Sequence, residues 1–384
     1  MKKLKIVQLI GYGAPVSSDN KKSIGGVEVF LYDLIKNMDT TAFQHAVLYA
    51  TDSPMIDKFK QNNVEVMFHP IKHKFSLLSI IKLGQLLKQR NIDIIHSHAL
   101  RYDFAGAVIS FITKIPLVIT RHVAISDHLI SFWKKMLFLI FDFFSMTVAK
   151  FVIGISDDAR NKIRRSHFIN PKKVLKIYCG IDLKKYHKNM QKQKLIKKRF
   201  KIDSKDFIIG TVAQLREYKG IDVLLRAAPR VLANHRNVKF LIIGGGPEKQ
   251  NLENLAKQLR IAENVIFAGF QKDIFTWISF FDIFALTSRR EGLPIAILEA
   301  MYAETPVLAS SVGAVGEVVK NDYNGKIVDP DDHEQVADKL VELMANRQKL
   351  KQYGKNSHYF VVKNFNINRA VDNYQELFRK IIFN

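Results

Sequence analysis

The sequence predicts an α/β protein built from two doubly wound parallel sheets, and three observations lead to this class. Short apolar runs alternate with helix-period stretches along most of the chain, which is the pattern of consecutive β-α-β units. The alternation stops at a basic segment around residues 188–201 and then starts again. The 384 residues suit two domains, and 47% hydrophobic residues can fill two cores.

The first half of the chain supplies the strands of the first expected sheet. Each is a short apolar run, as in strands that helices cover on both faces. These runs are 5–10, 45–49, 64–68, 92–96, 117–120, 151–155 and 174–177, with helix-period stretches such as 27–37 and 77–90 between them. The opening MKKLKIVQLIGYG has too short an apolar part for a signal peptide, so a buried first strand is the better interpretation.

The second half repeats the pattern with expected strands at 207–212, 238–243, 265–267, 283–286 and 306–309. We therefore expect an N-terminal Rossmann-like domain over residues 1–187 and a second one over 188–360. Residues 361–384 are expected to form a helix that packs back across the junction. Sheets of this kind bind ligands beyond the carboxyl ends of their strands, so two facing sheets would place a cleft between the domains.

The charge of the chain is strongly positive, with 59 Lys+Arg against 36 Asp+Glu and a formal net charge of +23. Such a balance attracts phosphate-rich partners, and it equally fits a lysine-rich surface that serves only solubility. Nucleic acid is not expected, because no aromatic ladder or nucleic-acid-binding signature accompanies the basic clusters. The single cysteine, Cys179, excludes a disulfide framework and predicts a reducing cytoplasm.

The apolar segment 131–151 leaves two interpretations open. Asp142 and Lys150 interrupt it, so no uncharged run approaches the roughly 20 residues that a membrane span requires. It is either a largely buried helix of a layered domain or a helix that lies in a membrane interface, with Trp133 among its anchors. The second interpretation predicts peripheral contact with an anionic membrane, on its cytoplasmic face.

Three motifs stand where expected strands end. Gly25 and Gly26 precede a helix and let a loop pass close to a ligand. Arg216 and Lys219 follow the first strand of the second half, a suitable place to bind a diphosphate, although a solvated turn would look the same. The glycines at 244–246 form a turn between a strand and a helix, without the spacing of a dinucleotide fingerprint.

The fourth motif is REGLPIAILEAM, with Glu291 before an expected helix and Glu299 inside it. Eight helical steps span about 12 Å, more than the roughly 5–9.5 Å between two glycosidase carboxylates that act on one bond. The spacing favours two anchors for a long polar ligand, with the amides near Gly292 and Leu293 facing an anion between them. A nucleoside diphosphate sugar has this layout.

Taken together, the motifs resemble the family 4 glycosyltransferases, which have the two-domain fold called GT-B. The resemblance covers nearly the whole chain and ends in the E-x7-E pattern. The segments that carry it, in order, are GGVEVFLYDLI, DIIHSH, TRH, VIGISDDAR, GIDLKKY, LREYKGIDVLLRA, LIIGGGPEKQNL, VIFAGF, EGLPIAILEAM and VGEVVKNDYNGKIVDPDD.

The resemblance implies a role for each matching residue of the second half. Glu291 would hold hydroxyls of the donor sugar, and Glu299 would hold those of the ribose. Arg216 and Lys219 would stabilise the diphosphate as charge develops on the leaving group. The backbone of the segment after Glu291 would line the donor site, that is Gly292, Leu293, Pro294 and Ile295.

In the first half, the resemblance places Gly25 and Gly26 close to the diphosphate and the acceptor. His122, in TRH, would reach the sugar near the reacting carbon, unless local backbone groups satisfy its ring. His98, in HSH, would shape the acceptor side.

Three departures from the family pattern bear on these roles. Ala213 and Gln214 stand where many relatives have Gly-Arg, so Arg216 would have to replace the missing arginine. Cys179 stands where relatives often have asparagine. The aspartates of DPDD, 329–332, look like a metal-binding D-x-D but precede a helix, so helix capping is expected. No metal ligand, divalent metal requirement or other cofactor is predicted.

The sequence thus predicts a hexosyltransferase that moves a hexose-type sugar from a nucleotide diphosphate sugar, with uridine favoured, to a glycan or lipid-linked acceptor. Retention at the anomeric carbon is implied by the family, and cell-envelope polysaccharide or lipopolysaccharide synthesis is the expected setting. Two alternatives stay open: a nucleotide-sugar epimerase or hydrolase on the same scaffold, and a non-catalytic nucleotide-sugar-binding protein. The oligomeric state is not predicted.

Overall fold

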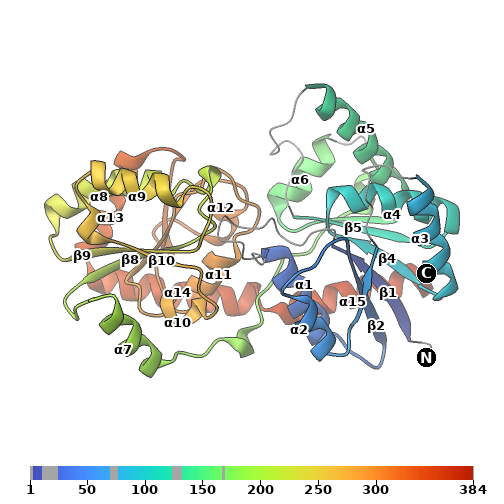
Figure 1. Cartoon of the computed structure of the whole chain (residues 1–384), viewed down its shortest axis with the longest axis horizontal. Coiled ribbons are helices and arrows are strands. Elements are labelled where there is room, and N and C mark those ends of the chain that lie inside the picture. The colour runs from blue at the N-terminus through green and yellow to red at the C-terminus, as the bar shows by residue number, and fades with distance from the viewer. Residues whose placement is uncertain (1–2, 11–24, 70–76, 123–131, 167–168, 384) are drawn as a thin grey trace. The chain divides into compact units, whose positions relative to one another are not determined.

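The structure, a computed structural model, describes residues 3–10, 25–69, 77–122, 132–166 and 169–383 (Figure 1). The chain divides into two compact units, Met1–Gly180 with Ile367–Asn384, and Ile181–Asn366. The sequence-based boundary at 187 and 188 lies inside the second unit, because Tyr186 packs against Phe275 and Tyr302 of that unit.

The described part of the first unit contains a parallel sheet of seven strands in the order β3-β2-β1-β4-β5-β6-β7. Every strand expected from the first half is present, and the register is parallel throughout. The strands are β1 (Leu4–Leu9), β2 (Phe43–Tyr49), β3 (Glu65–Phe68), β4 (Ile94–Ser97), β5 (Leu117–Arg121), β6 (Phe151–Gly154) and β7 (Val174–Lys176).

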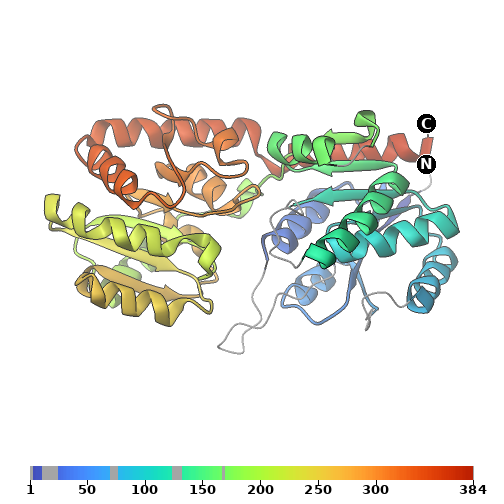
Figure 2. The ribbon, with the colours of Figure 1, turned by 90° about the horizontal axis from the view of Figure 1, so that it is seen from above.

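Helices cover both faces of this sheet, which explains why its strands are apolar on both sides (Figures 1 and 2). One core joins the strands to α3, α4 and α5, through side chains such as Leu83, Tyr102 and Met146. On the other face Phe378 of the last helix packs against Phe43 and His96. The helices are α1 (Gly26–Asn37), α2 (Ile56–Gln61), α3 (Leu77–Gln89), α4 (Leu100–Thr113), α5 (Phe132–Val148), α6 (Asp157–Ser166) and α15 (Ile367–Phe383).

The second unit has a parallel sheet of six strands over its described residues, in the order β10-β9-β8-β11-β12-β13. The strands are β8 (Phe207–Val212), β9 (Val238–Ile243), β10 (Val265–Gly269), β11 (Ile283–Leu286), β12 (Val307–Ser310) and β13 (Gly325–Val328). The helices are α7 (Met190–Arg199), α8 (Ile221–Asn234), α9 (Lys249–Gln258), α10 (Ile274–Ile278), α11 (Ile295–Tyr302), α12 (Val315–Val318), α13 (His333–Met344) and α14 (Arg347–Asn364).

The doubly wound α/β class is confirmed in each unit, but β13 was missed from the sequence. Its four residues GKIV carry a lysine in the middle, which hides the apolar run. The structure buries Lys326 to 5% exposure and pairs its ammonium with Asp322 and Glu342. A buried, paired lysine stem packs like an apolar residue, and composition alone does not reveal the pairing.

Within the segment 131–151, residues 132–148 form α5. The interpretation as a largely buried helix is wrong for one face of α5, because the side chains there are exposed. Asp142, Ser145 and Met146 are buried, whereas Met136, Leu137, Leu139, Ile140 and Phe143 are exposed. No helix among the described residues has the length and apolar character needed to cross a membrane.

A buried ionic cluster ties α4 and α5 to β5. Arg121 donates to the Asp142 carboxylate, and its guanidinium lies 3.1 Å from Oδ2 of Asp103. Both aspartates are almost fully buried. Burial raises the pKa of Asp103 to about 6, against the opposing effect of Arg121.

We predict that Asp103→Asn flattens the pH dependence of stability between about pH 4 and pH 6. Because the folded-state pKa of Asp103 is raised, the native protein binds a proton that the unfolded chain releases, and this stabilisation is lost as pH rises towards 6. A shift of the Asp103 pKa from 3.8 to about 6 corresponds to about 3 kcal/mol in the free energy of unfolding. Urea denaturation at a series of pH values, followed by circular dichroism, measures it.

The matched variant is Asp142→Asn, which removes the carboxylate bonded to Arg121. It is expected to lower stability across the whole pH range, because the buried guanidinium loses one of its two carboxylate partners. An unchanged slope in Asp103→Asn would show that Asp103 titrates as an ordinary carboxyl group.

Candidate donor-binding site and first-unit histidine cluster

The candidate site of the second unit lies where the strand order of its sheet reverses. β9 and β10 follow β8 on one side of it in the sheet, and the next strand, β11, pairs with β8 on its other side. The loops after β8 and β11 are therefore neighbours at the carboxyl edge of the sheet, where doubly wound folds bind ligands. The first carries Arg216 and Lys219, and the second carries Glu291.

Lys219 and Glu291, both predicted from the sequence, lie together. The Lys219 ammonium donates to Oε1 of Glu291 at 2.6 Å, and the Ser288 hydroxyl donates to the same oxygen at 2.7 Å. The side chains of Lys219 and Glu291 are only 18% and 7% exposed, so solvent screens this pair less than a surface pair. Sequence reasoning missed Ser288, although it stands in the same loop.

A close backbone contact holds the two loops together at Gly220. This residue has φ of +59°, and a Cβ there would lie 1.9 Å from the carbonyl oxygen of Thr287. The Thr287 hydroxyl donates to the Gly220 carbonyl at 2.7 Å. Only glycine fits this position, and it sets Lys219 beside the loop that carries Glu291.

Glu291 lies in the loop before α11 and Glu299 lies inside the helix, as predicted. Pro294 is the N-cap of α11 and Ile295 is its first helical residue. The buried neighbours of Glu299 attach α11 to the core, namely Ile297, Leu298, Ala300 and Met301.

Glu299 is held by a residue that the sequence analysis did not single out. The Tyr186 hydroxyl donates to Oε1 of Glu299 at 2.8 Å. The Tyr186 ring packs 5.0 Å from Phe275 and 5.8 Å from Tyr302, so the hydroxyl has a fixed position. The signal in the sequence is an aromatic residue at the end of GIDLKKY, but nothing there indicates its partner.

The Arg216 side chain takes no part in the hydrogen bonds that join Lys219 and Ser288 to Glu291. It lines a hollow of about 420 Å³ with residues of α8 and α9, among them Arg226, Glu248 and Asn251. Its role as a substitute for the arginine missing at Gln214 stays a prediction.

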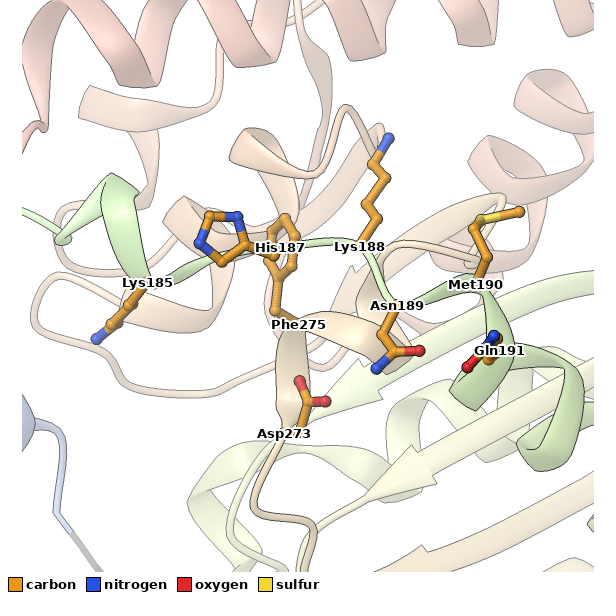
Figure 3. A pocket seen from close by; sticks show the side chains of 8 residues that line it. All are labelled: Lys185, His187, Lys188, Asn189, Met190, Gln191, Asp273 and Phe275. Carbon is orange, nitrogen blue, oxygen red and sulfur yellow. The ribbon is translucent and has the colours of Figure 1, made fainter.

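A second hollow of about 510 Å³ lies beside Tyr186 (Figure 3). Phe275, which backs the Tyr186 ring, is one of its walls. The ammonium groups of Lys185 and Lys188 point in different directions in Figure 3. These two lysines therefore do not form a joint anion site.

In the first unit, Gly25 is the N-cap of α1 and Gly26 is its first residue. Glu28 fixes this turn, because its Oε2 accepts from the Gly25 amide at 3.2 Å. Its Oε1 accepts from the hydroxyls of Ser53 at 2.6 Å and Tyr49 at 3.2 Å. Residues 11–24, which precede Gly25, lie outside the described residues.

His98 and His122 follow the neighbouring strands β4 and β5, and their rings are bonded to one another. Nδ1 of His98 lies 3.2 Å from Nε2 of His122. Burial lowers the pKa of His122 to about 4 and the pKa of His98 well below its usual value, so both rings are neutral at pH 7. Phe30 of α1 packs its ring edge-on against His122. One ring nitrogen of His122 is thus matched by His98, and residues 123–131, which follow it, lie outside the described residues.

In the structure, two of the aspartates at 329–332 have a structural contact, one as a helix cap and one in an ion pair. Asp332 accepts from the Gln335 amide at 2.8 Å and caps α13, which confirms the expected capping. Asp331 pairs with Arg289, which also binds Asp222 through two hydrogen bonds.

Comparison with known proteins identifies two adjoining family models. The model described as Glycosyltransferase Family 4 matches residues 24–185, and the model described as Glycosyl transferases group 1 matches residues 192–359. Together they span most of the described chain.

Among curated proteins, the chain is similar to the UDP-Gal:alpha-D-GlcNAc-diphosphoundecaprenol alpha-1,3-galactosyltransferase of Escherichia coli. The two are 24% identical over 348 residues, 88% of this chain and 89% of the relative. The capsular polysaccharide biosynthesis glycosyltransferase CapM of Staphylococcus aureus is also 24% identical, over 86% of this chain and 87% of the relative. Among solved structures, Anabaena Alr3699/HepE in complex with UDP matches with a TM-score of 0.85, 22% identity and coverage of 98% and 100%.

We predict that Lys219 and Glu291 are energetically coupled. A double-mutant cycle with Lys219→Met and Glu291→Gln should give a coupling free energy of about 1–3 kcal/mol, because both groups are mostly withdrawn from water. Urea denaturation of the wild type, both single variants and the double variant measures it.

The control cycle uses Arg230→Met and Glu334→Gln on the surface of the same unit. Their side chains are 50% and 62% exposed, so the coupling should stay below about 1 kcal/mol. Equal coupling in the two cycles would mean that burial does not strengthen the Lys219–Glu291 pair.

Proposed function

Since this chain belongs to the family 4 glycosyltransferases and is an enzyme of that class, we propose that it moves a hexose-type sugar from a nucleotide diphosphate sugar to a glycan or lipid-linked acceptor. The observation that carries the proposal is the pair of fixed carboxylates around α11. Glu291 is bonded to Lys219 and Ser288 before the helix, and Glu299 is bonded to Tyr186 within it. This arrangement supplies an anchor for each end of a nucleotide sugar.

Glu291 is well suited to hold hydroxyls of the donor sugar. Among the described residues, both of its recorded side-chain donors bind Oε1, so Oε2 would be the oxygen that accepts a hydrogen bond from a sugar hydroxyl. A carboxylate already bound to an ammonium group is a weak nucleophile. Its role is therefore to position the sugar, which agrees with transfer with retention through the leaving phosphate.

Lys219 would stabilise the negative charge that develops on the diphosphate as the bond to the sugar breaks. Its ammonium is held close to Glu291 in a site with little solvent, where a fixed charge acts more strongly than in water. The amides before α11 and Arg216 would add to this stabilisation. We propose that this charge makes a divalent metal unnecessary for transfer.

A uridine diphosphate sugar is the favoured donor. The Escherichia coli relative is named for UDP-Gal, and the similar HepE structures hold UDP and UDP-glucose. In this chain the ribose would be held by Glu299, which Tyr186 keeps in place.

The acceptor is proposed to be a cell-envelope glycan or its lipid-linked precursor. One relative is named for a diphosphoundecaprenol acceptor and another for capsular polysaccharide synthesis. The exposed stripe of α5, with Met136, Leu139, Ile140 and Phe143 at helical spacing, would contact an anionic membrane peripherally, on its cytoplasmic face. Lys173 donates to the Thr147 carbonyl near the end of α5, and its charge favours anionic lipid.

We predict that Glu299→Ala weakens binding of UDP by roughly 10- to 100-fold, because the ribose hydroxyls lose a charged acceptor. Tyr186→Phe keeps the carboxylate but removes the hydrogen bond from the Tyr186 hydroxyl, and should cost less. Isothermal titration calorimetry with UDP measures both. Glu263→Ala, in the turn before β10 at the opposite edge of the sheet, is the control and should bind UDP like the wild type. Unchanged affinity in Glu299→Ala would remove Glu299 from the site.

We predict that the full chain floats with vesicles of phosphatidylglycerol and phosphatidylcholine, and that added salt weakens this binding. The double variant Ile140→Ser, Phe143→Ser should lose it, since both side chains are exposed on α5. Leu195→Ser removes an equally exposed apolar residue from the basic helix α7 and should leave flotation unchanged. Binding that survives the α5 changes would contradict this surface.

A further inference from the structure

A row of polar side chains crosses four neighbouring strands of the first sheet and ends at its carboxyl edge. His45 lies on β2, Gln8 on β1, His98 directly after β4 and His122 directly after β5, in the spatial order of the sheet. Gln8 Nε2 lies 3.1 Å from His45 Nδ1, and Gln8 Oε1 lies 2.9 Å from His98 Nε2. His98 Nδ1 lies 3.2 Å from His122 Nε2, which completes the row.

Three members of the row are buried and His122 is partly buried, and this restricts the protonation of the rings. Gln8 has no exposed surface, and His98 and His45 are 6% and 7% exposed. Burial lowers the pKa of His45 to about 3 and that of His122 to about 4, and the pKa of His98 well below its usual value. Each ring is therefore a neutral imidazole with one N–H and one bare nitrogen at physiological pH.

The Gln8 amide has its carbonyl oxygen towards His98 and its N–H group towards His45. This orientation sets which ring nitrogen of each histidine carries the proton. Its carbonyl oxygen can only accept, so His98 donates to it through Nε2–H and keeps a lone pair on Nδ1. That lone pair can only accept, so His122 donates through Nε2–H and keeps its own lone pair on Nδ1. At the other end the amide N–H donates to Nδ1 of His45.

We propose that Gln8, acting through His98, is the positioning residue that gives His122 its proton on Nε2 and its lone pair on Nδ1. The bare Nδ1 is then an acceptor for a sugar hydroxyl of a substrate that binds the first unit. The identity of that hydroxyl donor rests on the proposed function, whereas the state of the ring does not.

Packing alone does not account for the row. Nε2 of His45 is buried without a hydrogen-bond partner among the described residues, which lowers stability. Apolar side chains would fill the same space without that penalty. A second buried contact, from His96 through Thr120 to Tyr374, lies beside the row and does not join it through any recorded hydrogen bond. The row is thus a separate unit with one end at His122.

The first test reads the His122 ring directly in the full chain. Long-range 15N–1H NMR distinguishes a protonated from a bare ring nitrogen, and His122→Gln identifies the signals of His122. In the wild type we expect Nε2 protonated and Nδ1 bare. In Gln8→Met and His98→Leu we expect the Nδ1-protonated form of His122 to become detectable.

Two matched variants separate positioning from packing. His98→Gln keeps a donor for Gln8 and an acceptor for His122, so it should restore the wild-type tautomer that His98→Leu loses. Thr120→Val breaks the neighbouring His96 contact at equal volume and should leave His122 unchanged. A wild-type ring protonated on Nδ1, or an equal change in Thr120→Val, would overturn the proposal.

The second test separates this proposal from the proposed function. With UDP-glucose and UDP-galactose as donors, Gln8→Met should lower kcat roughly five- to tenfold and leave KM for the donor unchanged, the loss expected for one hydrogen bond. If the wild type transfers or hydrolyses neither donor, the proposed donor class fails while the NMR result still decides the role of Gln8. A normal kcat in a variant with the altered tautomer would overturn the catalytic part.

Discussion

The contact between Gly220 and Thr287 is the constraint on which the second-unit site depends. The two loops approach so closely that a Cβ at position 220 would overlap the Thr287 carbonyl, and the Thr287 hydroxyl closes the contact. Lys219 precedes Gly220 and Ser288 follows Thr287, so both donors to Glu291 are carried by this one contact. The order of the strands brings the loops together, and the glycine lets them touch.

The same principle fixes the other polar groups before any ligand is present. Glu299 is bonded to a tyrosine packed between two aromatic rings, and Glu28 is bonded to the first turn of α1 and to two hydroxyls. Side chains held in this way lose little conformational entropy on binding. The cost is that carboxylates are withdrawn from water, which each unit offsets with short hydrogen bonds from buried donors.

The sequence was sufficient for the architecture and for the residues that follow strands, since strands covered on both faces give strong apolar runs. Lys219, Glu291 and Glu299 could be found in this way. Tyr186 could not, because its partner is 113 residues away and no local pattern connects them. Gln8 was visible as a polar residue near the end of the strand LKIVQL, but its role depends on which strands become neighbours. The strand β13 was missed for a related reason. The ion pair between Lys326 and Asp322, which allows the lysine to be buried within the strand, is visible only in the folded structure.

Each unit carries polar groups at the carboxyl edge of its sheet, beside the point where the strand order reverses. The groups are ionic in one unit and neutral in the other. In the second unit a lysine ammonium and a carboxylate form an ion pair there, beside the place proposed for an anionic diphosphate. In the first unit the row of histidines is buried deeply enough to stay neutral. A charged imidazole would have no lone pair left for a sugar hydroxyl. Burial of the row therefore favours hydrogen bonding over charge, and Gln8 determines the direction of that bonding.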